Sequence, residues 1–117
     1  MTALVAAVVA LSATAAVALR GPTRPVSPRQ WDVAAERVRH DADIAWYHAR
    51  AERDPTGAMD HLKLAALYLQ RARERGTPAD LALAEQEART SLANRRQHNS
   101  EAFHALAIAL VGQHRFL

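Results

Sequence analysis

Histidines are the side chains of this 117-residue chain that could most readily bind a metal ion. His40 and His48 lie eight residues apart, which would put both on one side of a helix. The sequence contains no two histidines one helical turn apart, as in His-x-x-x-His or His-Glu-x-x-His. His98, His104 and His114 are separated by six and ten residues, intervals that do not repeat on one helical face. We therefore expect no metal site and interpret the histidines as solvated or partly packed side chains.

The residues needed for covalent or phosphate chemistry are also missing. There is no cysteine, which excludes a disulfide framework, a thiolate metal site and a cysteine nucleophile. The four glycines form no phosphate-binding loop, and no serine lies in a nucleophile motif. Glu85 and Glu87 lie two positions apart on an expected helix, so they point to different sides and form no catalytic pair. We expect no catalytic residue, no cofactor and no enzyme activity.

Three aromatic residues lie on the first helix expected after the N-terminal region. Trp31, Trp46 and Tyr47 could stack on a ligand, or they could anchor that helix by packing. We favour the anchor, because burial is the commoner role of aromatic side chains.

The charge of the chain is only mildly positive. Fifteen Lys and Arg residues oppose twelve Asp and Glu residues, and Lys63 is the only lysine. Between Arg37 and Arg75 the arginines are interleaved with acidic residues, which is typical of a mixed, solvated surface. Because the basic residues do not cluster with aromatic ones, we expect no nucleic-acid binding. A small basic bundle that oligomerises or touches anionic lipid is a further hypothesis.

Residues 1–19 contain no charged side chain. We interpret them as a signal peptide or an N-terminal membrane anchor in the form of an apolar helix, because residues 2–19 approach the length needed to cross a bilayer. A helix buried in the domain is the less favoured interpretation, since the run is apolar on all sides. Small residues at 13–15 and 16–18 offer cleavage sites, whereas the arginines that follow the run would hold an uncleaved domain in the cytoplasm. We expect an exported protein, periplasmic or extracellular, or one anchored by its N-terminus.

Residues 20–28 contain three prolines and form the expected linker. Behind this linker, turn residues divide the chain into four expected helices and no strand, because no segment alternates with a period of two. A long helix occupies 29–57 and ends in Asp54-Pro55-Thr56-Gly57. Gly76 ends the second helix, Thr77-Pro78 opens the third, and Asn99 is the expected cap of the fourth. Arg95 and Arg96 would complement the dipole of the third helix.

The long first helix has two apolar stripes at helical spacing. The longer one is the apolar face formed by Trp31, Ala34, Ala35, Val38, Ala42, Ala45 and Ala49. Ile44, Tyr47 and Ala51 form a second stripe. The second helix has the widest apolar coverage, so we expect it to be the most buried.

The second and fourth helices share one order of large and small residues. His61-x-x-Leu64-Ala65-x-x-Tyr68 resembles Phe103-x-x-Leu106-Ala107-x-x-Leu110, and the third helix supplies the small residues of a partner. Those small residues are Ala84, Ala88 and Ser91. From about residue 41 to 117 the chain is therefore similar to the tetratricopeptide repeat family. The spacing of 42 residues exceeds the family's 34, and His61 replaces a usual aromatic residue.

The resemblance implies antiparallel helical hairpins of an α-solenoid, with 29–57 as a degenerate unit and 58–117 as repeats of which the last is truncated. The face of Phe103, Leu106 and Leu110 would then lack its partner helix. The chain would be a fragment of a longer protein, or another subunit would cover its end.

The resemblance also implies a non-enzymatic scaffold that binds an apolar or helical segment of another protein. Residues 2–19 would contact the membrane if they are not cleaved. The concave surface would bind the partner through Met59, Leu62, Ala66, Leu69, Glu101, His104, Ile108 and Val111. The alternatives are that these residues pack on other parts of the repeat, or that the chain is the helical portion of a larger enzyme or regulator.

Overall fold

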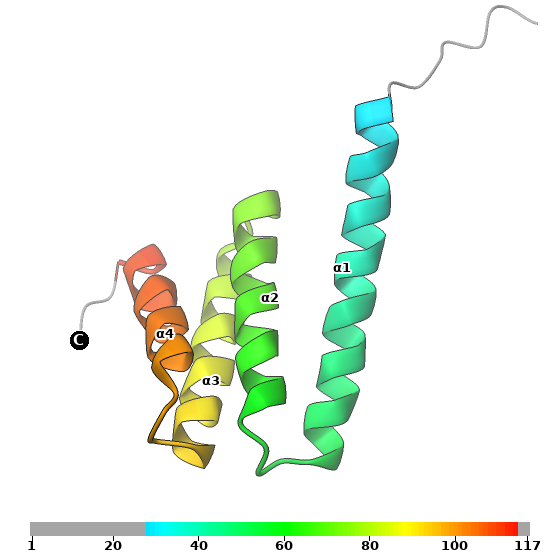
Figure 1. The fold of residues 1–117 in the computed structure, drawn as a ribbon. Coiled ribbons are helices and arrows are strands. Elements are labelled where there is room, and N and C mark those ends of the chain that lie inside the picture. Colours follow the sequence, from blue (N-terminus) through cyan, green and yellow to red (C-terminus); the bar gives the residue numbers. More distant parts are fainter. Residues whose placement is uncertain (1–27, 115–117) are drawn as a thin grey trace, which may run out of the picture. The chain divides into compact units, whose positions relative to one another are not determined.

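A computed structural model describes the backbone of residues 28–114 and the side chains of residues 32–114. This part of the chain forms four helices and contains no strand, which confirms the all-α class (Figure 1). The helices are α1 (Pro28–Arg53), α2 (Met59–Arg75), α3 (Pro78–Asn94) and α4 (Ser100–Gly112). The expected apolar helix at 1–19 and linker residues 20–27 lie outside the described residues.

The chain divides into two compact units, Met1–Asp32 and Val33–Leu117. Of the first unit the structure describes only residues 28–32, which form the start of α1. Among the described helices, none is long and apolar enough to cross a membrane.

Proline and glycine lie at the helix ends, close to where the sequence predicts them. Helix α1 begins at Pro28, one residue before its expected start, and ends at Arg53, before the turn residues that were included in the range 29–57. Pro28 is the first residue of α1 and Pro78 the first of α3, since a proline at this position loses no helical hydrogen bond. Gly76 follows α2 with φ 64°, in the left-handed region, and its N–H donates to the Ala72 carbonyl at 2.8 Å. A side chain at this φ would be strained, so the glycine permits the turn from α2 into α3.

The predicted polar caps of α3 and α4 were partly wrong. The Asn99 side chain makes no capping bond to α4. Its amide instead donates to the carbonyls of Ser91 and Arg95 at the end of α3, because the last carbonyls of a helix lack partners in the helix. Thr77 makes no side-chain capping bond either, and α3 ends at Asn94, before the two arginines assigned to its last turn.

Consecutive helices pack antiparallel to one another. Asp60, at the start of α2, binds Arg50 at the end of α1, and the Ser91 hydroxyl, near the end of α3, donates to the Ala58 carbonyl just before α2. Gln113, just after α4, donates to Glu85 in the first half of α3. It follows that α2 and α4 run parallel, and both contact α3 (Figure 1).

Small residues bring these helices into close contact. Five buried alanines have no exposed surface: Ala65, Ala84, Ala88, Ala102 and Ala109. Larger side chains fill the space beside them, and Leu64 is the largest apolar side chain that is fully buried, at 1% exposure. The small partner residues predicted on α3, including Ser91, are all buried. We expected the second helix to be the most buried, but α2 and α4 each have five buried residues.

The two apolar stripes of α1 differ in burial. Val38, in the longer stripe, is 71% exposed, whereas Ile44, in the shorter one, is 7% exposed and belongs to the core. Tyr47 packs against that core, so it is an anchor as expected, but Trp46 is exposed. The longer stripe is mostly alanine, and burying alanine removes little apolar surface from water; the shorter stripe has the larger side chains.

The two Leu-Ala pairs are not equivalent contact points. Ala65 is fully buried, but Ala107, its counterpart at a spacing of 42 residues, is exposed. The expected unpartnered face is also reduced to one residue: Phe103 is 58% exposed, while Leu106 and Leu110 are buried. Helix α4 packs against α3. The face that it buries is shifted relative to the residue pattern that it shares with α2.

Candidate functional site

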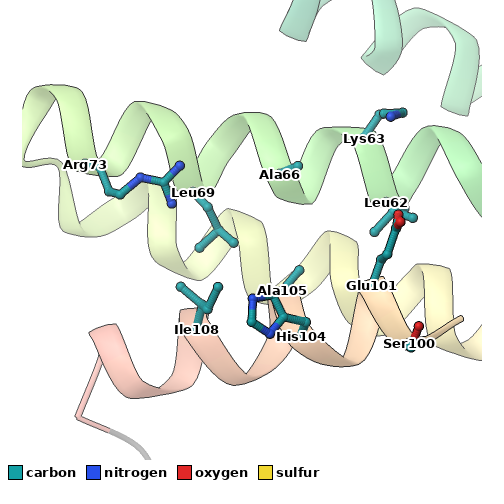
Figure 2. Close-up of a pocket in the computed structure, with 10 residues that line it drawn as sticks. All are labelled: Leu62, Lys63, Ala66, Leu69, Arg73, Ser100, Glu101, His104, Ala105 and Ile108. Atoms are coloured by element: carbon teal, nitrogen blue, oxygen red, sulfur yellow. The ribbon is translucent and has the colours of Figure 1, made fainter.

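A groove with a volume of ≈ 570 Å³ lies between the parallel helices α2 and α4. Figure 2 shows side chains from both helices converging on it, with α3 behind. We call it the α2–α4 groove. Its lining residues are Leu62, Lys63, Ala66, Leu69, Arg73, Ser100, Glu101, His104, Ala105 and Ile108.

The floor of the α2–α4 groove is apolar. Leu62, Leu69 and Ala105 are buried beneath it, while Ala66 and Ile108 are exposed to solvent. Helical spacing explains this arrangement, because residues 62, 66 and 69 repeat on one face of α2. The groove therefore presents an open apolar surface rather than an enclosed cavity, a form suited to a segment of polypeptide.

Charged residues lie at the rims. Lys63 and Arg73 line the groove from α2, and Glu101 lines it from α4. All three are exposed. A ligand in the groove would thus meet an apolar floor, two cations on one side and one carboxylate on the other.

Six of the eight residues predicted to bind a partner line this groove: Leu62, Ala66, Leu69, Glu101, His104 and Ile108. Met59 and Val111 are exposed but lie outside the lining. The prediction omitted Lys63, Arg73, Ser100 and Ala105. Arg73 could have been found, since it lies one turn beyond Leu69 on the same face of α2.

Ser100, Glu101 and His104 all line the groove and include the residue types of a hydrolytic triad. No hydrogen bond joins any two of these side chains in the described part of the chain. A serine nucleophile needs a histidine base that is itself held by an acid. As they stand, the three residues supply polar contacts and no proton relay.

Comparison of this chain with family models, with curated proteins and with solved structures finds no match.

A second, smaller cavity of ≈ 260 Å³ contains a carboxylate–imidazole pair. The His61 Nδ1–H donates to Glu87 Oε2 at 2.6 Å, and both side chains are largely buried. His61 Nε2 has no hydrogen-bond partner and is shielded from solvent. A general base needs to reach the proton that it accepts, so this pair joins α2 to α3 but cannot act on a bound molecule in this conformation.

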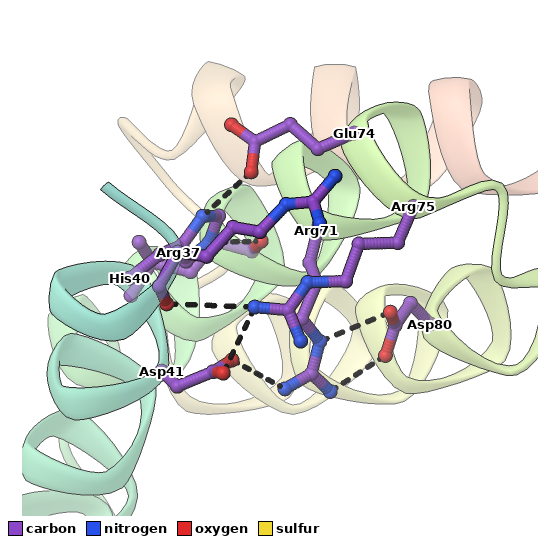
Figure 3. Close-up of polar contacts among 8 residues, drawn as sticks. Arg37, His40, Asp41, Arg71, Glu74, Arg75 and Asp80 are labelled. Atoms are coloured by element: carbon purple, nitrogen blue, oxygen red, sulfur yellow. Dashed lines mark hydrogen bonds and ion pairs between the residues drawn. The ribbon is translucent and has the colours of Figure 1, made fainter. Parts of the chain in front are cut away.

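His40 lies in a polar cluster that joins α1 to α2 (Figure 3). Its Nε2–H donates to the Leu67 carbonyl at 2.8 Å, and Nδ1 lies 3.3 Å from a carboxylate oxygen of Glu74. His40 is buried, contrary to the expected solvated or partly packed state. No group of three potential metal ligands occurs among the described residues.

Arginines bind the acidic residues of the same cluster. Arg75 donates to Asp41 at 2.9 Å, and this hydrogen bond, with a further contribution from Arg71, lowers the pKa of Asp41. Hydrogen bonds from Gln70 and His40 lower the pKa of Glu74. The hydrogen bonds to Asp80 raise the pKa of Arg71. Each shift favours the charged form, so these residues connect α1, α2 and α3 as ion pairs.

Proposed function

We propose that this chain is a non-enzymatic interaction module of tetratricopeptide type, in which the α2–α4 groove binds a segment of another protein. The observation that supports this most directly is an open apolar groove built from one face of each of two parallel helices. Helix-binding and peptide-binding grooves use this combination of apolar floor and polar rim.

The helix arrangement supports the assignment to a solenoid of helical hairpins. In such proteins each hairpin buries one face against its neighbour, and the first helices of successive hairpins line a concave surface. Here α2 and α3 form one hairpin, and α4 stands beside α2 as the first helix of the next would. On this proposal α1 is the second helix of a preceding degenerate unit.

We also propose that the protein is exported or anchored to a membrane by its N-terminus. The uncharged run at 1–19 and the proline-containing segment that follows support this location. The N-terminal residue of the mature protein, measured after expression with the whole sequence, tests it. A start near residue 16 or 19 indicates cleavage, intact residues in the membrane fraction indicate an anchor, and intact residues in the soluble fraction contradict both.

Binding is tested with a displayed library of randomised 16-residue segments selected against the full chain. Selected segments are then measured on three variants: Ala66→Arg and Ile108→Arg, which place a charge in the groove, and Leu83→Arg, a partly exposed position outside the groove lining. We expect both groove variants to weaken binding by about 10-fold or more, since each buries an unpaired charge in the complex. The Leu83 variant should bind like the original chain.

Two results would contradict the proposed function. One is a library that yields no segment above background. The other is selected segments that bind the groove variants and the original chain equally. Circular dichroism of each variant establishes that the helices are retained before binding is compared.

A further inference from the structure

Lys63 and Arg73 differ from the neighbouring cations of α2. Arg71 and Arg75, two residues on either side of Arg73, bind Asp80 and Asp41. Lys63 and Arg73 have no ion-pair partner and no side-chain hydrogen bond among the described residues. Both line the α2–α4 groove. The helix therefore directs its paired cations towards α1 and α3 and its unpaired cations towards the groove.

The two unpaired cations lie along one rim of the groove. They are ten residues apart on α2, which corresponds to about 15 Å along the helix axis. Figure 2 shows Lys63 near the end of the groove that contains Leu62 and Glu101, and Arg73 beyond Leu69 at the end that contains Ile108. Glu101 is the only acidic residue in the lining and belongs to the opposite rim. The rims thus differ in charge.

We infer that the occupant of the α2–α4 groove is an amphipathic helix of another protein, with two acidic side chains about eleven residues apart that face Lys63 and Arg73. This inference rests on the proposed function and adds the chemistry of the partner. A helix matches the 15 Å between the cations with residues at i and i+11, which lie on the same face after three turns. Its apolar stripe would lie on Leu62, Ala66, Leu69, Ala105 and Ile108.

Charge complementarity distinguishes this occupant from other apolar segments. Opposite charges across a rim add modest affinity and exclude segments with the wrong sign. A basic segment would be repelled by two cations on the α2 rim and attracted by one carboxylate on the α4 rim. A neutral segment would bind through the apolar floor without a preferred direction. Acidic residues on one flank also orient the bound helix, because only one rim is cationic.

The experiment uses a displayed library of helical segments with a constant leucine stripe. Flanking positions vary among Glu, Gln and Lys, and the library is selected against the full chain. Segments that no longer bind the Ala66→Arg variant are classed as groove-dependent and are kept for analysis. We expect Glu at two positions about eleven residues apart on one flank of these binders. A purified binder should lose about 3- to 10-fold in affinity when both glutamates become glutamine, since an exposed ion pair contributes little individually.

A charge exchange provides the matched test. In the Lys63→Glu, Arg73→Glu double variant, the Glu segment should bind more weakly than its Lys version, which reverses the order on the original chain. Arg96→Glu is the control for net charge, because Arg96 lies outside the groove and has no ion-pair partner among the described residues. That variant should keep the original order.

The outcomes separate this inference from the proposed function. Groove-dependent binders without acidic enrichment, or an order that does not reverse in the double variant, overturn the acidic helix and leave the groove as a docking site. The absence of any groove-dependent binder overturns both. Sedimentation that shows self-association abolished by Ala66→Arg would assign the groove to a second copy of the chain and would also overturn the acidic partner.

Discussion

Arg71 and Asp80 make a two-point ion pair across the α2–α3 turn, with Nε 3.0 Å from Oδ2 and Nη2 2.7 Å from Oδ1. Asp80 is 3% exposed, so its carboxylate depends on this guanidinium for its charge partner. Arg71 also contacts Asp41 of α1 at 3.4 Å and lies over the ring of Tyr68. One side chain therefore connects three helices.

Replacement of Arg71 by alanine should destabilise the protein strongly. The change leaves the Asp80 carboxylate buried without a counter-charge, which costs about 3–5 kcal/mol when a pair is fully buried and less here, because Arg71 is partly exposed. Urea unfolding followed by circular dichroism measures the loss. The control is Arg39→Ala, which removes an exposed pair with Glu36 and should change the unfolding free energy by no more than about 0.5 kcal/mol.

Asn99→Asp should be more harmful than Asn99→Ala. The Asn99 amide donates to three acceptors, the Ser91 carbonyl, the Ser91 hydroxyl oxygen and the Arg95 carbonyl. Alanine removes these bonds, although the Ser91 carbonyl still accepts the Arg95 backbone N–H at 2.9 Å, so we expect a loss of about 1–2 kcal/mol. Aspartate places a carboxylate oxygen against the carbonyl oxygens at the C-terminal end of α3, and we expect this repulsion to outweigh the favourable dipole at the start of α4, which begins at the next residue.

Thermal unfolding of both Asn99 variants tests this order. Asn94 provides the control, because its amide donates to two carbonyls in the α1–α2 loop at an exposed position. Asn94→Asp should be milder than Asn99→Asp. Equal effects at the two positions would mean that burial of Asn99 does not govern its contribution.

Leu64→Ala should lower the unfolding free energy by about 2–5 kcal/mol, through lost burial and the cavity left behind. Leu64 belongs to the hydrophobic core cluster and is 1% exposed. Leu83→Ala removes the same atoms at a position that is 37% exposed, and we expect a smaller loss. Chemical denaturation of the two variants gives the comparison, and similar losses would contradict the packing of the core described above.

Acid should weaken the contact between α1 and α2. The pKa of Asp41 is lowered, first by its hydrogen bond from Arg75, and that of Glu74 is lowered, first by its hydrogen bond from Gln70. A carboxyl whose pKa is lower in the folded state stabilises that state above its unfolded pKa, near pH 4. This contribution disappears as the pH falls through the folded value.

The measurement is urea unfolding from pH 6 to pH 3 for the original chain and for the double variant Asp41→Asn, Glu74→Gln. We expect the double variant to be less stable at pH 6. The difference should shrink as the pH falls towards 3, because the original carboxyls then become protonated as well. A constant difference over this range would show that the two carboxylates do not stabilise the fold through their charge.

Local chemistry allowed the helix ends to be predicted from the sequence. Pro28, Pro78 and Gly76 act on their own backbone, so no distant contact is needed to place them. Helical periodicity likewise brought Leu62, Ala66 and Leu69 to one face of α2, and His104 and Ile108 to one face of α4. Most of the groove lining follows from these two periodic rows once the helices are known to be neighbours.

Long-range contacts determined the rest of the structure. Both stripes of α1 satisfy the same periodicity, and the shorter one is buried because Ile44 and Tyr47 find large partners on α2. Ala65 and Ala107 occupy equivalent positions in the shared residue pattern, yet only Ala65 is buried. The unpaired state of Lys63 and Arg73 is also non-local, since pairing depends on which acids the packing of α1 and α3 brings near. Periodicity defines the faces of a helix, whereas the choice of the face that is buried depends on the volume and charge of the helix opposite.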